Sequence, residues 1–209
     1  SILSPASANS LVGLKPTTGS LSRSGVVPIS ATLDTTGPIT RTVADAVALF
    51  NAMAGYDQED TAMPLLSADF SLIYRLQSLS GKRLGVLQSL SDNEIYQTAI
   101  QLLLENDAAI VESDFAPERF ERFTEFLGAE MVQDLRLYLE NVATDVSIKS
   151  ISDLQEFNLG DTELRAPYGQ GLVDMMAELA LSSEDLAALR EQVQSYGRTQ
   201  LDRLFADAN

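Results

Sequence analysis

The first 41 residues constrain the fold most, because 22 of them are serine, threonine, glycine or proline. This composition disfavours a continuous helix and a long strand, since these residues favour turns. Two short apolar pieces, residues 11–14 and 26–29, interrupt it and predict short strands or buried extended segments. A disordered linker would carry more charge and fewer apolar anchors. We therefore expect a long irregular segment anchored to a core, a kind of segment that often lines a site.

A helix is predicted directly after this segment. Thr42 is suited to cap its first turn, with Asp45 three residues on. Apolar residues recur at helical spacing over residues 43–53, and Gly55 stands where a glycine ends many helices. The alanines of this helix favour close packing on a sheet. The polar run 57–60 that follows predicts an exposed loop with solvated carboxylates, and we prefer this interpretation to a metal site.

The middle of the chain has the pattern of a βαβ unit. Residues 82–87 predict a buried strand, residues 93–105 an amphipathic helix, and residues 108–111 a second strand, which indicates parallel pairing and the α/β class. The remainder is predicted to be mostly helical. Apolar residues at three- and four-residue steps over residues 120–139 favour one long helix whose aromatic stripe is core. Three further helices are predicted, over residues 152–158, 170–181 and 183–206.

The composition excludes several kinds of chemistry. The chain has no cysteine and no histidine. It therefore cannot form a disulfide, a thiol nucleophile, a histidine-based zinc site or a Ser-His-Asp triad from its own residues. Nucleophilic chemistry would have to use serine or threonine activated by something other than imidazole, such as a lysine or an α-amine.

The charge also limits the partners. The net charge is −16, which argues against nucleic acids and against an anionic membrane surface. Residues 1–55 are near neutral, with three basic and two acidic residues, so the acidity lies on the later, helical part. No window holds the roughly 18 uninterrupted apolar residues that a membrane span needs.

Ser1 has three interpretations from the residues alone. It could be an N-terminal nucleophile that uses its own amine as base. It could be an internal residue on a turn before a Pro-containing extended segment, or simply an end of the chain. These alternatives stay open at this point.

Five pieces in ordered spacing resemble the amidase signature family: SILSPAS from Ser1, GLKPT from Gly13, SGVVP from Ser24, LDTTGPITR from Leu33 and VAD from Val43. The remainder of the chain is only loosely similar, although YGQ at Tyr168 resembles a segment of bacterial members. The resemblance implies an α/β fold with a mixed sheet flanked by helices, incomplete here, and a mostly helical variable lobe. We expect one partial domain over residues 1–209, divided into a signature segment 1–60, a βαβ-like segment 61–115 and a helical lobe 116–209.

The resemblance implies that Ser1 is the catalytic nucleophile, with Ile2 and Pro5 in register. Relatives often have arginine where this chain has Leu3, a tolerated departure. The resemblance places a second serine in a cis peptide, a lysine and most oxyanion-hole amides upstream of Ser1. Lys15 belongs to the GLKPT turn and is not expected to be catalytic.

Asp34 and Arg41 are interpreted as scaffold charges that hold the loop beside the site, rather than as acid–base groups. We expect both ends of the chain to lie inside one larger domain and the 209 residues alone to be inactive.

The implied activity is hydrolysis of a carboxamide C–N bond through a serine acyl-enzyme, without metal or other cofactor. The substrate would be a small-molecule or peptide amide, in a cytoplasmic protein, and a homodimer is left open. Three alternatives remain: the A subunit of an aminoacyl-tRNA amidotransferase, an inactive amidase-fold protein that binds ligands, and a true N-terminal nucleophile hydrolase.

Overall fold

The computed structural model describes residues 2–63, 71–75, 78–115 and 118–207. The chain divides into two compact units, one of residues 1–74 and 124–188 and the other of residues 75–123 and 189–209. Ser1, the predicted nucleophile, lies outside the described residues.

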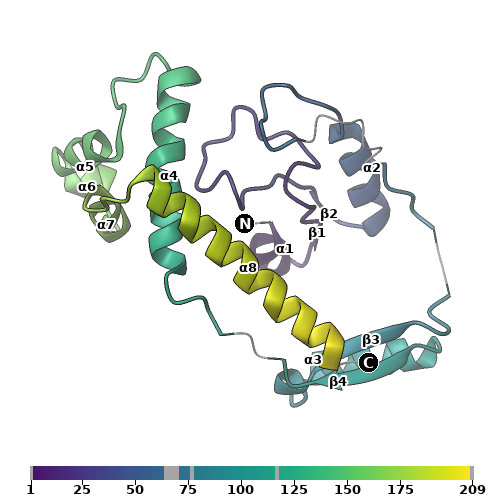
Figure 1. Cartoon of the computed structure of the whole chain (residues 1–209). Helices are drawn as coiled ribbons and strands as arrows, with labels where there is room; N and C mark the ends of the chain where they lie inside the picture. The colour runs from purple at the N-terminus through teal and green to yellow at the C-terminus, as the bar shows by residue number, and fades with distance from the viewer. Residues whose placement is uncertain (1, 64–70, 76–77, 116–117, 208–209) are drawn as a thin grey trace. The chain divides into compact units, whose positions relative to one another are not determined.

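The first unit begins with a small antiparallel sheet that helices contact (Figure 1). Strands β1 (Val12–Gly13) and β2 (Ile39–Thr40) pair in the register Val12↔Thr40 and Gly13↔Ile39. The elements that contact them are α1 (Leu3–Ala8) and α2 (Val43–Met53). The predicted cap of α2 is confirmed, because the Asp45 amide donates to the Thr42 hydroxyl at 3.1 Å.

Residues 26–29 are not the strand or buried segment that the sequence predicts. Val26, Val27 and Ile29 are exposed, and the described backbone there is irregular. Gly25 adopts a positive φ of 78°, and Pro28 lacks the amide that a strand ladder would need. Turn chemistry therefore overrides the apolar character of this piece.

The remainder of the first unit is helical. Its helices are α4 (Phe123–Asn141, from Thr124 onward), α5 (Ile151–Leu159), α6 (Thr162–Arg165), α7 (Gly171–Ala177) and the first turn and a half of α8 (Ser183–Asp207). A buried cluster of Leu135, Leu139, Ile151 and Met176 joins α4, α5 and α7. The stripe predicted over residues 120–139 is core only in part: Leu135 and Leu139 are buried, whereas its aromatic members Phe123 and Tyr138 are half-buried. Helix α6 was not predicted, and α7 ends earlier than expected.

The second unit contains the predicted βαβ arrangement. Strands β3 (Arg83–Leu87) and β4 (Ala109–Ser113) pair in parallel, with Arg83 opposite Ala109. A 3₁₀ turn, η1 (Gln88–Leu90), and helix α3 (Glu94–Glu105) connect them, and α3 contacts β4. The Asn93 side chain caps α3 by accepting from the Tyr96 amide at 3.0 Å.

The α/β class is confirmed, with one antiparallel and one parallel strand pair in the part of the chain that the structure describes. The boundaries 1–60, 61–115 and 116–209 stay a prediction. None of the helices described is both long and apolar enough to cross a bilayer.

Candidate active site

The segment after Ser1 begins a short helix rather than an extended stretch, so that part of the prediction is wrong. Ile2 is the N-cap residue of α1, and the Ala6 amide donates to the Ile2 carbonyl at 3.2 Å. Pro5 is the third helical residue, within the first turn, where backbone amides have no intrahelical acceptor. Proline therefore leaves this helix intact. Ala6 is only 1% exposed, which anchors α1 to the core.

Backbone of β1 and of the loop that precedes β2 approaches Ile2 closely. A Cβ on Gly13 would lie 2.8 Å from the Ala6 Cβ and 3.3 Å from the Ile2 carbonyl oxygen. A Cβ on Gly37 would lie 2.2 Å from the Leu14 carbonyl oxygen and 2.7 Å from the Ile2 Cδ1. Only glycine permits approaches this close. The two glycines thereby hold the residue that follows the predicted nucleophile.

Replacing Gly37 with alanine is expected to destabilise the protein by about 1–3 kcal/mol, because the new methyl group overlaps backbone that cannot move away easily. The free energy of unfolding, measured by denaturant titration, checks this. Gly55→Ala is the matched control, since a Cβ there meets nothing within 4 Å. A Gly37→Ala variant as stable as Gly55→Ala would contradict the close approach.

A buried ion pair ties the loop between β1 and β2 to the segment after α2. The Arg23 guanidinium donates to both carboxylate oxygens of Asp60, from Nε to Oδ2 at 3.0 Å and from Nη2 to Oδ1 at 2.8 Å. The two side chains are 12% and 3% exposed. Two backbone amides, those of Arg23 and Ala62, also donate to this carboxylate. Paired and hydrogen-bonded in this way, both charges can be buried.

The prediction of solvated carboxylates over residues 57–60 is therefore wrong for Asp60. Its hydrogen bonds from Arg23 lower the pKa of the carboxyl to about 2, against the opposing effect of burial. Asp57 accepts from the Ser22 hydroxyl at 2.6 Å, and this bond is the main cause that lowers the pKa of Asp57. Arg23, the partner of Asp60, lies 37 residues away in the sequence, so no local pattern reveals it.

Among the described residues, no group of three or more metal-binding side chains gathers.

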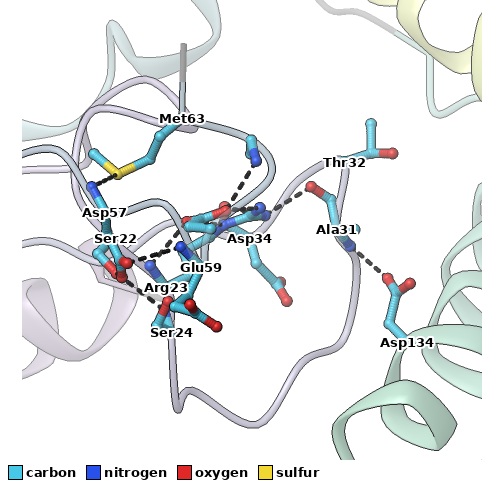
Figure 2. A network of polar contacts seen from close by, with 12 residues as sticks. Ser22, Arg23, Ser24, Ala31, Thr32, Asp34, Asp57, Glu59, Met63 and Asp134 are labelled. Carbon is cyan, nitrogen blue, oxygen red and sulfur yellow. Dashed lines mark hydrogen bonds and ion pairs between the residues drawn. The ribbon is translucent and has the colours of Figure 1, made fainter. Parts of the chain in front are cut away.

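Arg23 also organises the loop itself (Figure 2). Its Nη1 donates to the Ala31 carbonyl oxygen at 2.7 Å and to the Asp34 carbonyl oxygen at 3.4 Å. The Asp34 carboxylate accepts from the amides of Ile29 and Ser30 at 2.7 and 2.9 Å. These contacts support the interpretation of Asp34 as a scaffold charge. The same role for Arg41 stays a prediction, and Arg41 is exposed.

Two acidic residues of α4, Glu130 and Asp134, were not expected in the site and hold the tip of this loop. Glu130 is 0% exposed and Asp134 is 8% exposed. Glu130 accepts from Ser30 and Thr32, and Asp134 accepts from the Ala31 amide at 2.6 Å. One sequence signal could have found them: at four-residue steps they continue the stripe that begins with buried Phe126.

Lys15 lies on the surface of the loop. It is exposed, and its Nζ donates to the Pro16 carbonyl oxygen at 3.3 Å. A lysine that acts as a base must be desolvated or held near another cation to lower its pKa. The exposed position supports the expectation that Lys15 is not catalytic.

Solved structures of amidases resemble this chain over nearly its whole length. The solved structure of an amidase family protein from Bacillus anthracis superimposes with a TM-score of 0.83 at 28% identity, covering 99% of this chain and 43% of that one. Peptide amidase from Stenotrophomonas maltophilia superimposes with a TM-score of 0.76 at 30% identity, covering 92% and 42%. The chain thus has the fold of the amidases. A family model described as Amidase matches residues 1–206, and the chain belongs to this family.

Two sequence relatives differ in how far their similarity extends. A probable amidase of Arabidopsis thaliana is 35% identical and matches 92% of this chain and 38% of its own length. The A subunit of the glutamyl-tRNA(Gln) amidotransferase of Cutibacterium acnes is 38% identical but matches only 54% of this chain and 24% of its own length. The chain spans less than half the length of the relatives that it matches.

Proposed function

We propose that this chain belongs to an amide hydrolase in which Ser1 is the nucleophile. The observation that carries the proposal is the Amidase family match over residues 1–206, which includes Ser1 and every signature piece around it. The close approach of Gly13 and Gly37 to Ile2 supports it further, because a nucleophile needs a rigid neighbour to hold its geometry.

The proposed reaction follows from the inertness of amides. The Ser1 hydroxyl forms a C–O bond to the carbonyl carbon while its proton passes to a base, and backbone amides stabilise the oxyanion. The C–N bond then breaks as the leaving nitrogen takes a proton. Water cleaves the acyl-enzyme to the carboxylic acid and restores the serine. A second serine in a cis peptide and a lysine, both upstream of Ser1, would serve as the base, as the resemblance to the amidase signature family implies.

The substrate class that we favour is a small-molecule or peptide carboxamide. Support comes from peptide amidase, which is 30% identical over 92% of this chain. The loop between β1 and β2, residues 14–38, is called the signature loop here. Its residues contribute small side chains and tightly held backbone, which allow a reacting carbonyl to approach closely. No cofactor enters this mechanism.

The alternative is the A subunit of an aminoacyl-tRNA amidotransferase. The signature pieces are common to both activities and do not discriminate between them. The amidotransferase relative matches 54% of the chain and the amidase relative matches 92%, which is support for the amidase.

The proposal is tested by treating the full-length protein with a serine-directed acylating probe and mapping the adduct by peptide mass spectrometry. We expect the adduct on Ser1, together with release of ammonia from simple carboxamides without any partner protein. Labelling at another serine would overturn the assignment of the nucleophile. Ammonia release only in the presence of a partner protein would favour the amidotransferase.

A further inference from the structure

We propose that Glu130 is a positioning residue for the amidase reaction, acting together with Asp134 through residues 30–32 of the signature loop. This inference rests on the proposed function, because it concerns the geometry around Ser1. The two carboxylates are four residues apart on α4 and therefore share one face of the helix. That face meets the tip of the loop between β1 and β2.

Hydrogen bonds join each residue of the loop tip, residues 30–32, to α4. Glu130 Oε2 accepts from the Ser30 hydroxyl and from the Thr32 amide at 3.3 Å, and Oε1 accepts from the Thr32 hydroxyl at 2.6 Å. The Ala31 amide donates to Asp134 Oδ2 at 2.6 Å, a contact visible in Figure 2. Every residue from 30 to 32 therefore donates to α4. Ser30 and Glu130 are both 0% exposed, so water cannot replace these bonds.

The Ser30 hydroxyl also forms a hydrogen bond with the next turn of the loop. While its proton is donated to Glu130, its oxygen accepts from the Leu33 amide at 3.1 Å. The Ser30 carbonyl oxygen accepts from the Asp34 amide at 2.8 Å. Glu130 thus sets the direction of the hydroxyl on which the turn over residues 30–34 depends.

The loop continues from this turn to the predicted nucleophile. The Thr36 hydroxyl donates to the Ser22 carbonyl oxygen at 3.1 Å, and Gly37 follows, in contact with Ile2. Ile2 is bonded directly to Ser1. Hydrogen bonds and close backbone contacts therefore run from α4 to the residue beside Ser1. Loss of the Glu130 contacts is expected to misplace this segment rather than to remove a reacting group.

Arg23 interacts electrostatically with Asp134, one of the two carboxylates. Asp60 is the main cause that raises the pKa of Arg23, through its hydrogen bond, and the charges of Asp34 and Asp134 raise it further. Arg23 therefore interacts electrostatically with three carboxylates of this region, and its direct partner is Asp60.

The test uses the full-length protein with Glu130→Ala and Glu130→Gln. For Glu130→Ala we expect kcat on a simple carboxamide to fall roughly 10- to 100-fold, as misplacement near a reacting group does, with KM within about threefold. The rate of Ser1 labelling by an acylating probe should fall in parallel. Glu130→Gln keeps one carbonyl acceptor and should recover part of the rate. All rates are measured at a temperature where circular dichroism shows each variant folded.

Glu140→Ala is the matched control, because Glu140 lies on the same helix in an exposed pair with Arg136 and should leave kcat unchanged. If wild type is active and both Glu130 variants match its kcat and labelling rate while folded, this inference is overturned and the proposed function stands. A lowered melting temperature with unchanged kcat would likewise overturn it, showing a structural role only. If wild type neither hydrolyses amides nor labels at Ser1, the proposed function fails and this inference fails with it.

Discussion

A Ser1→Ala variant of the full-length protein is expected to hydrolyse carboxamides roughly 10⁴-fold or more slowly than wild type, the scale of loss seen when a serine nucleophile is removed. The reason is chemical, since without the hydroxyl no acyl-enzyme forms and water must attack an unactivated amide. Ground-state binding does not use the attacking atom, so KM or the inhibition constant of a product should change little. Steady-state kinetics on one carboxamide, with both proteins purified identically, measures the effect.

Ser7→Ala is the control for this variant, because Ser7 is also a serine of this segment and is exposed near the end of α1. It should retain wild-type kcat and remain as stable as wild type. If Ser1→Ala kept more than about a tenth of the wild-type rate, a loss far smaller than nucleophile removal causes, Ser1 would not be the nucleophile.

Replacing Arg23 with alanine is expected to lower the free energy of unfolding by about 3–5 kcal/mol, the cost of leaving one partner of a buried pair uncompensated. Asp60, with a side chain 3% exposed, would keep only backbone donors. The carbonyl oxygens of Ala31 and Asp34 would lose their donor as well. Denaturant unfolding at pH 7 gives the difference from wild type.

The control for Arg23 is Arg136→Ala, which breaks an exposed ion pair whose side chains are 50% and 45% exposed. Such pairs on a helix contribute roughly 0.3–0.5 kcal/mol. If Arg23→Ala lowered the free energy of unfolding no more than the control does, the buried pair would not be a major source of stability.

The same pair should leave a signature in the pH dependence. The folded pKa of Asp60 is lowered to about 2 from an ordinary value of 3.8, so the unfolded chain binds more protons between these values. The stability that the pair contributes is fully present above about pH 4 and is lost as the pH falls through about 2. The difference between wild type and Arg23→Ala should therefore shrink over this range. A constant difference from pH 7 to pH 2 would argue against the ion pair as its source.

Local signals predicted most of the regular elements correctly. The caps at Thr42 and Asn93 confirm two helix starts, because a side-chain acceptor three residues before a free amide is a contact within one turn. The parallel pairing of β3 with β4 followed from the strand, helix and strand order. Helix α1 was missed, since proline and serine in its sequence favour turns locally while burial of Ala6 favours the helix.

The long-range contacts that hold the loop of the candidate site could not be predicted from local sequence patterns. Arg23 and Asp60 are 37 residues apart, and Ser30 and Glu130 are 100 residues apart. Nothing near Asp60 in the sequence distinguishes it from its exposed neighbour Glu59. Which carboxylates are buried depends on which segments the fold brings together. The sequence pattern alone predicted that the carboxylates of residues 57–60 are solvated. This prediction was wrong for Asp60 because its partner is distant in the sequence.

The sequence by itself determined the family, through ordered short pieces that include Ser1, and its composition excluded histidine and cysteine chemistry by the residues of this chain. It also determined most helices and the parallel strand pair, because their signals lie within a few residues of one another. Only the tertiary structure decided how the signature loop is held, by Arg23 on Asp60 and by Glu130 and Asp134 on residues 30–32. The physical reason is that a buried charge persists only where distant donors converge on it, and convergence is a property of the fold.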